Sequence, residues 1–407
     1  MQKLLCLSNG HGEDEIACRI ATALQQQPNP PELAGLPIVG VGHAYRQAGI
    51  TIVGPVQTMP SGGFVNQDGR QLVRDMQAGL VQLTLAQLRA VKAWAAVGGF
   101  ILAVGDIVPL VLAWLSGAPY ALVATAKSDY HLRDEETGIH PNLPWFERLE
   151  YCLGGVYLPW ERWLMNRPNC KAVYPRDRLT TTTLQRYSIP AIDLGNPMMD
   201  GFDAASADTS APPNCLTLLL LPGSRIPEAY ANWRQILQAV QGVIDTAPDR
   251  ALRCLAAIAP SLSLAELATT LVTMNWQANQ GSSTEFHHTL NPNIHLELST
   301  AFTVCAQQAD VAIAMTGTAT EQFVGLGKPA ITMPGRGPQF TLAFAQAQNR
   351  LLGCSVTLAP NPEAVAPALQ RLLSNADGLH AIAQNGYLRM GAPGAAQRIA
   401  KHLITLA

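Results

Sequence analysis

The sequence predicts an α/β protein built from two Rossmann-like domains. Its 407 residues are more than one ordinary hydrophobic core can hold, so two domains are expected. Short apolar runs that do not alternate with polar residues indicate parallel strands buried on both faces. Most of these runs are followed by a glycine-containing turn and then by a helical pattern, which is the alternation of an α/β fold.

Seven apolar runs are expected to be strands, at residues 4–7, 100–104, 121–124, 216–221, 252–257, 311–314 and 330–333. The strand-turn-helix pattern begins at residue 4, with a helix from about Asp14. It begins again at residue 216, with a helix from about Pro227. Residues 199–214 are rich in Ala, Ser, Asp and Pro and indicate a linker. We therefore expect domains at 1–198 and 215–385 and a C-terminal helical tail at 386–407.

Charge, cysteine content and hydropathy exclude several classes of function. The net charge is −2 and no block of Lys and Arg is present, which argues against nucleic acid as a partner. Eight scattered cysteines without a Cys-x-x-Cys pair indicate a reducing compartment, hence the cytoplasm, and no metal or cofactor is expected. The apolar stretch 97–126 is interrupted by Asp106 and two prolines, so a strand, a helix and another strand are expected there instead of a membrane span.

The strongest candidate binding site follows the expected strand at 311–314. A loop of small residues is expected there before a helix that opens at Glu321; the loop residues are Thr316, Gly317, Thr318, Ala319 and Thr320. Such a loop lets backbone N–H groups and a helix N-terminus face an anion, and Glu321 can bind a vicinal diol. The alternative is an ordinary helix capped by threonine, with Glu321 favoured by the helix dipole.

Two further loops are expected to contact the same ligand. Ser224 and Arg225 follow the strand at 216–221 and can hold a diphosphate together with backbone amides. Arg336 and Gln339 follow the strand at 330–333, where Arg336 either neutralises a phosphate or is simply solvated. An arginine and helix N-termini can stabilise a diphosphate leaving group without a metal, and the sequence has no Asp-x-Asp triplet to hold one.

These motifs resemble the lipid-A-disaccharide synthase family over about residues 194–333. The matching segments are Leu-Leu-Pro-Gly-Ser-Arg with Glu228 after it, Thr-Gly-Thr-Ala-Thr-Glu at 316–321, and Gly-Asn-Pro-Met-Met-Asp at 195–200. The resemblance implies the GT-B glycosyltransferase fold, with the donor in the cleft between the domains. It also implies that Ser224 and Arg225 hold the diphosphate of a UDP-sugar and that Glu321 holds the ribose or nearby hydroxyls.

The expected reaction is therefore inverting, metal-independent transfer of a sugar from a UDP-sugar to a lipid-linked acceptor at the cytoplasmic face of a membrane. UDP-N-acetylglucosamine or an acylated derivative is the expected donor. Two alternatives remain. One is a UDP-N-acetylglucosamine 2-epimerase, which shares the fold, and the other is a non-catalytic protein that binds a nucleotide-sugar.

Inverting transfer needs a base that takes the proton of the acceptor hydroxyl. His11 lies between Gly10 and Gly12 after the first strand, and the ordinary pKa of histidine, about 6.5, suits this work. Asp106, at the end of another strand, is the rival base. The alternative roles are a backbone contact for His11 and a helix cap for Asp106. Glu13 and Asp14 are expected to cap or favour the first helix.

Aromatic residues are concentrated in the segment 144–164, among them Trp145, Phe146, Tyr157, Trp160 and Trp163. We favour core packing or a dimer contact for them. The alternative is contact with lipid headgroups, since arginines lie among these aromatic residues.

Overall fold

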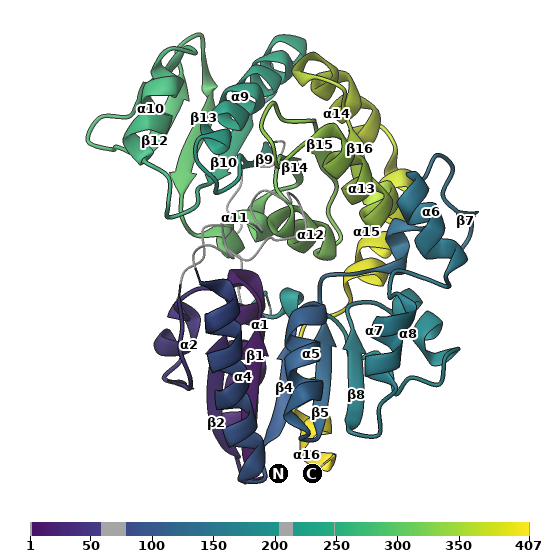
Figure 1. Ribbon diagram of the computed structural model, residues 1–407. Helices are drawn as coiled ribbons and strands as arrows, with labels where there is room; N and C mark the ends of the chain where they lie inside the picture. Colours follow the sequence, from purple (N-terminus) through teal and green to yellow (C-terminus); the bar gives the residue numbers. More distant parts are fainter. Residues whose placement is uncertain (1, 58–78, 203–214, 248, 407) are drawn as a thin grey trace. The chain divides into compact units, whose positions relative to one another are not determined.

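The computed structural model describes residues 2–57, 79–202, 215–247 and 249–406. The chain forms two compact units (Figure 1). The first comprises Met1–Asp200 and Ala392–Ala407, and the second comprises Gly201–Gly391. Both are α/β, as the sequence predicts.

The first unit is built on a six-stranded parallel sheet in the order β3-β2-β1-β4-β5-β8. Its strands are β1 (Lys3–Ser8), β2 (Glu32–Pro37), β3 (Thr51–Ile52), β4 (Phe100–Val104), β5 (Tyr120–Ala124) and β8 (Cys170–Pro175), with a small pair β6 (Arg133–Asp134) and β7 (Gly138–Ile139) outside the sheet. The helices of this unit are α1 (His11–Gln25), α2 (His43–Gln47), α4 (Leu80–Ala96), α5 (Ile107–Ser116), α6 (Trp145–Cys152), α7 (Pro159–Met165), α8 (Arg178–Gln185) and α16 (Ala395–Thr405).

Both faces of this sheet are covered. One apolar cluster joins the strands to α1, α2 and α16, and the other joins them to α4, α5, α7 and α8. The apolar stretch at 97–126 forms β4, α5 and β5, so the expected strand-helix-strand arrangement is confirmed. None of the helices in the described parts of the chain is both long and apolar enough to span a bilayer.

The second unit contains an eight-stranded sheet in the order β11-β12-β13-β10-β9-β14-β15-β16, parallel except for the antiparallel pairs at the β11 edge. The strands are β9 (Leu216–Leu221), β10 (Leu252–Ala257), β11 (Trp276–Ala278), β12 (Glu285–His288), β13 (Asn291–Ser299), β14 (Val311–Ala314), β15 (Ala330–Thr332) and β16 (Val356–Leu358). The helices are α9 (Glu228–Thr246), α10 (Leu264–Val272), α11 (Phe302–Gln308), α12 (Thr318–Gly325), α13 (Leu342–Leu352), α14 (Val365–Leu373) and α15 (Ala376–Met390).

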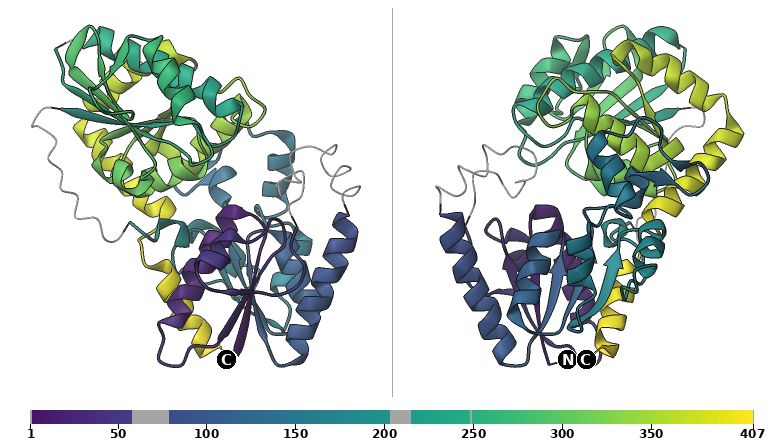
Figure 2. Two further views of the ribbon diagram at one scale, coloured as in Figure 1. Left: turned by 90° about the vertical axis from the view of Figure 1, so that its left-hand side faces the viewer. Right: turned by 45° about the vertical axis from the view of Figure 1, so that its right-hand side comes forward.

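The structure does not contain a separate C-terminal tail at residues 386–407, because these residues are divided between the two units. Residue 386 lies inside α15 of the second unit, whereas α16 belongs to the first unit and packs beside α1 (Figure 2). The carboxylate of Asp200 explains this return, because it accepts the backbone N–H groups of Gly394, Ala395 and Ala396 at 2.7–2.9 Å. Three N–H donors at the start of α16 are thereby satisfied by one side chain. Most of the expected linker, 203–214, lies outside the described residues.

Candidate functional site

The candidate site of the second unit lies where the order of its strands reverses direction. From β9 the chain proceeds to β10 on one side, and β14, on the other side of β9, leads on to β15. In open α/β sheets, ligands bind beside the carboxyl ends of the strands at such a switch point. The loops after β9 and β14 are neighbours here. A Cβ atom on Gly223 would lie 3.5 Å from the carbonyl oxygen of Met315 and 3.9 Å from Cγ2 of Thr316.

The loop after β14 is shorter than the sequence predicts. Helix α12 begins at Thr318, three residues before Glu321, and the first intrahelical bond runs from the N–H of Glu321 to the carbonyl of Gly317. Gly317 is the N-cap residue and no side chain caps the helix, so capping by threonine is wrong. Thr320 is fully buried and its hydroxyl donates to the carbonyl of Thr316 at 2.7 Å. Thr318 is exposed at the helix N-terminus.

Two polar side chains hold these loops, and sequence reasoning missed both. Gln348 of α13 donates to the carbonyls of Thr316 and Gly317 at 2.9 and 3.1 Å. Asn232 of α9 donates to the carbonyl of Pro222 at 3.1 Å. Both are nearly fully buried, at 3% and 2% exposure. The signal that could have revealed them is a single amide inside the apolar stripe of an amphipathic helix.

The second glycine loop, after β15, is held by Glu228 at the start of α9. Its Oε1 accepts the N–H of Phe340 at 2.8 Å and that of Gln339 at 3.3 Å. The N–H of Gly335 closes the loop on the carbonyl of Phe340 at 2.7 Å. The acidic residue that follows the Pro-Gly-Ser-Arg segment therefore positions the neighbouring loop.

Three of the predicted binding residues meet in one pocket of about 670 Å³, namely Arg225, Arg336 and Gln339. Helices α9 and α10 and the neighbouring residues of the same two loops form the rest of its wall. Partial burial lowers the pKa of the Arg225 guanidinium, against the effect of nearby Glu228. None of residues 316–321 lines this pocket, and Ser224 does not line it either. The structure thus divides the predicted site between the switch-point loops and a pocket beside α9.

The first unit has a switch point of its own, between β1 and β4, and there the loop before His11 contacts Asp106. Asn9 donates through Nδ2 to both carboxylate oxygens of Asp106 at 3.0 Å. Asp106 also accepts the N–H of Val108 at 2.9 Å and is the N-cap of α5, as its alternative role predicted.

His11 is the first residue of α1 and is exposed, as is Gly12, and Gly10 is the N-cap residue. Neither Glu13 nor Asp14 caps the helix through its side chain, so the capping role is wrong, but both lie in the first turn of α1, where acidic residues favour a helix. Burial raises the pKa of Glu13, and the nearby Asp106 carboxylate adds to this. Burial also raises the pKa of Asp14 to about 6, although the Ser8 hydroxyl donates to its carboxylate. Glu13 is thus a third acid-base candidate that sequence reasoning missed.

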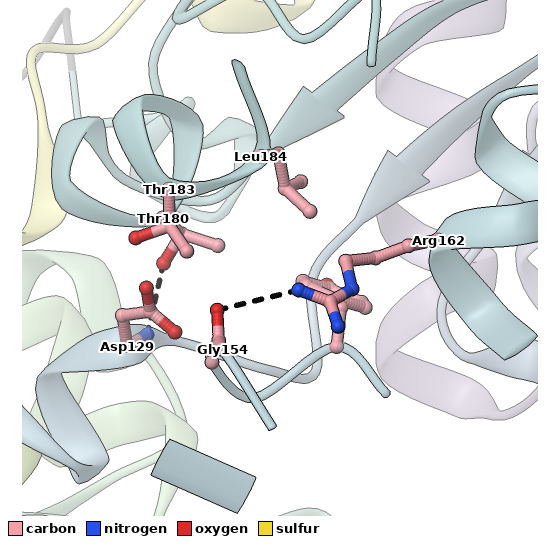
Figure 3. A pocket seen from close by; sticks show the side chains of 8 residues that line it. Asp129, Gly154, Arg162, Thr180, Thr183 and Leu184 are labelled. Carbon is pink, nitrogen blue, oxygen red and sulfur yellow. Dashed lines mark hydrogen bonds between the residues drawn. The ribbon is translucent and has the colours of Figure 1, made fainter. Parts of the chain in front are cut away.

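A further polar group lies after β5 and β8 (Figure 3). Asp129 accepts the N–H of Val156 at 3.0 Å and its own N–H donates to Thr180 at 2.9 Å. Arg162 donates to the carbonyl of Leu153 at 2.6 Å. The pocket that these residues line has no room for a water-sized sphere. Their contacts are internal, so this group fixes the segment between α6 and α8.

The aromatic segment contradicts one of the two favoured expectations, core packing, and leaves a dimer contact as a prediction. Trp145, Phe146, Trp160 and Trp163 are 47–79% exposed, so core packing is wrong for these four side chains. Only Tyr157 of the five residues named above is buried. The guanidinium of Arg167 lies over the Trp163 ring, 4.1 Å from its centroid.

No protein-family model matches the sequence, and no curated protein matches it. Solved structures do show the fold. The chain is similar over its full length to S. aureus MnaA bound to UDP (TM-score 0.59, 14% identity, 98% of that chain covered). It is also similar over its full length to Acinetobacter baumannii MurG (0.57, 14%, 100%) and to CalG4, the calicheamicin glycosyltransferase (0.58, 15%, 98%). The chain therefore has the GT-B-type architecture of two Rossmann-like domains.

Proposed function

We propose that this protein is a glycosyltransferase that uses a UDP-sugar as donor and a lipid-linked molecule as acceptor, as the resemblance to lipid-A-disaccharide synthase implies. The observation that carries the donor assignment is the pairing of the loops after β9 and β14 at the switch point of the second sheet. Gly223 leaves no side chain between these loops, and the N-terminus of α12 opens beside them. Backbone N–H groups and a helix N-terminus suit an anionic diphosphate. MnaA, which has the same fold, was solved with UDP.

Each donor residue has a role in this proposal. Ser224 and the backbone of the loop after β9 contact the diphosphate, and Arg225 stabilises the negative charge of the leaving group. Glu321, in the first turn of α12, binds hydroxyls of the ribose. Thr318 is the hydroxyl of the 316–320 segment best placed to contact the ligand, because Thr320 is buried.

The proposed chemistry is a single displacement. The acceptor oxygen bonds to the anomeric carbon as the bond from that carbon to the β-phosphate oxygen breaks. UDP leaves with the electron pair, and a base takes the hydroxyl proton. His11 and Asp106 remain the candidates for the base. The Asn9 contact keeps the Asp106 carboxylate in a fixed position, which favours Asp106 as a preorganised acceptor of the proton.

A second candidate function is epimerisation of UDP-N-acetylglucosamine, since a Neisseria meningitidis 2-epimerase shares the fold with a TM-score of 0.54 over 99% of this chain. The placement of the histidines favours transfer. His287 and His288 lie on β12 and His295 lies on β13, away from the loops after β9 and β14. An epimerase site would need several acids and histidines around the donor.

The test begins with binding and ends with products. UDP and UDP-sugars are expected to raise the melting temperature, while ADP and GDP are the control ligands. Mass spectrometry then follows the incubated UDP-sugar with and without a lipid extract. A new glycolipid together with free UDP supports transfer, whereas an isomeric UDP-sugar formed without lipid supports the epimerase. Binding of UDP with neither product indicates a non-catalytic binder, and no effect of any uridine nucleotide overturns the donor assignment.

We also propose that the exposed aromatic residues of α6 and α7 bring the protein to a lipid surface at the cytoplasmic face of a membrane. Tryptophan next to arginine suits the interfacial region of a bilayer, where the ring is half-buried and the cation meets phosphate. Trp160 is 56% exposed, and Arg167 is stacked on Trp163.

Vesicles that contain an anionic phospholipid test this contact by cosedimentation. The double variant Trp145→Ser, Trp160→Ser is expected to lose most of the binding and to keep the wild-type melting temperature, because both side chains are exposed. Tyr387→Ser, a substitution of an exposed aromatic residue of the second unit, is the control and should bind as wild type. Equal binding of all three proteins would rule out this surface.

A further inference from the structure

The pocket beside α9 gathers three arginines from three different segments. Arg225 follows β9, Arg234 lies on the second turn of α9, and Arg336 belongs to the loop after β15. Tyr230 of α9 and two threonines of α10, Thr269 and Thr270, line the same pocket. Its volume of about 670 Å³ falls within the usual range for small-molecule sites.

The two carboxylates in the wall already have partners within the protein. Glu228 accepts the N–H groups of Gln339 and Phe340. Glu266 is hydrogen-bonded to the hydroxyl of Tyr230, which also accepts the N–H of Ser263 at 2.9 Å. Among the residues that the structure describes, neither Arg234 nor Arg336 forms a salt bridge. The three guanidinium groups and two carboxylates of the lining give the wall a net formal charge of +1, and Arg234 and Arg336 carry charge that no salt bridge within the described residues offsets.

We propose that this pocket binds a second anionic small molecule, one that carries phosphate groups, in addition to the donor. Guanidinium groups bind phosphate through two parallel hydrogen bonds, and Arg234 and Arg336, which the proposed donor site does not use, suit a ligand that carries phosphate. The hydroxyls of Tyr230, Thr269 and Thr270 can add neutral hydrogen bonds around the ligand. A nucleic acid does not fit, because the whole chain has a net charge of −2.

The pocket is separate from the switch-point loops but linked to them. None of residues 316–321 lines it, and its wall is formed by α9, α10 and the segments 225–227 and 336–339. Arg225 nevertheless continues the loop that contains Gly223 and Ser224, and Ser261 donates to the carbonyl of Ser224 at 2.9 Å. A ligand in the pocket therefore acts on the loop after β9, so its binding is coupled to that of the nucleotide.

Pyrophosphate is the probe, and isothermal titration calorimetry measures its binding to the full chain with and without saturating UDP. Arg234→Ala removes one guanidinium from the pocket and leaves the donor loops intact. It is expected to weaken pyrophosphate binding by about tenfold or more and to leave UDP affinity within about twofold. Arg371→Ala, at an exposed arginine in the last turn of α14, is the matched control and should bind as wild type.

The outcomes separate this inference from the proposed function. Pyrophosphate that binds in the presence of saturating UDP, and is lost in Arg234→Ala, supports a second site. Failure of pyrophosphate to bind, its displacement by UDP one for one, or unchanged binding in Arg234→Ala overturns it. Pyrophosphate binding without any UDP binding would refute the donor assignment and leave the pocket standing.

Discussion

The two units have the same arrangement at the point where the strand order reverses, but they hold it with different chemistry. In the first unit, Asp14 on the first helix bonds to Ser8 at the end of β1. In the second, Asn232 on the first helix bonds to the carbonyl of Pro222 just after β9. The first switch point thus rests on ionisable groups and the second on a neutral amide. The proposed function uses this difference, with proton transfer at the first switch point and binding of an anionic nucleotide at the second.

The largest effect is expected from the acid-base groups of the first switch point. Asp106→Asn and His11→Ala are expected to reduce kcat while UDP affinity stays within about twofold. The variant that lacks the true base should show a kcat about 10²–10⁴-fold lower than wild type, because general base catalysis contributes that much. Glu13→Gln is the third variant to be measured, since the Glu13 carboxylate interacts electrostatically with both Asp106 and His11. Normal turnover in both Asp106→Asn and His11→Ala would show that neither is the base.

A smaller effect is expected at the second switch point, where a substitution should lower the affinity for UDP instead of kcat. Gly223 has a φ of 100°, so Gly223→Ala strains the backbone and shifts the loop that faces Thr316. UDP affinity is expected to fall roughly tenfold. Gly281→Ala is the matched control, because that residue also has a positive φ, 79°, and has open space around it. If both variants bind UDP equally well, the loop after β9 does not contact the nucleotide.

The third effect concerns the stability of the first unit and its pH dependence. The pKa of Asp14 is raised to about 6 in the folded protein, above the unfolded value of about 4, so folding favours the protonated form. The stability that protonation contributes is therefore full below about pH 4 and is lost as the pH rises through about 6.

Asp14→Asn is consequently expected to raise the free energy of unfolding by about 2 kcal/mol at pH 8 and to change it little at pH 4. Urea denaturation at both pH values measures this. Asn232→Asp should do the reverse and make the second unit less stable at pH 8 than at pH 4. A pH-independent effect of Asp14→Asn would mean that the carboxylate is not desolvated.

The sequence was sufficient for the two domains and for the seven strands β1, β4, β5, β9, β10, β14 and β15, because buried parallel strands are continuous apolar runs that need no tertiary information. It also revealed the loops that follow these strands. It missed other strands of the two sheets, among them β2, β8 and β13, because polar residues or a proline interrupt their apolar character. It also missed Asn232 and Gln348 and the role of Glu228, since each acts on a backbone group of a loop outside its own helix. The exposure of Trp145 could not be predicted either, because the same spacing of aromatic residues occurs in hydrophobic cores and on protein surfaces.

The contact between Asp200 and α16 has a consequence for the order of events during synthesis. The first sheet is complete once β8 has left the ribosome, but the face covered by Ile399 and Leu403 stays open until residues 395–405 have followed. The entire second unit is made in the meantime. We therefore expect the second unit to finish folding before the first, so that the half of the chain made earlier is the half that matures last.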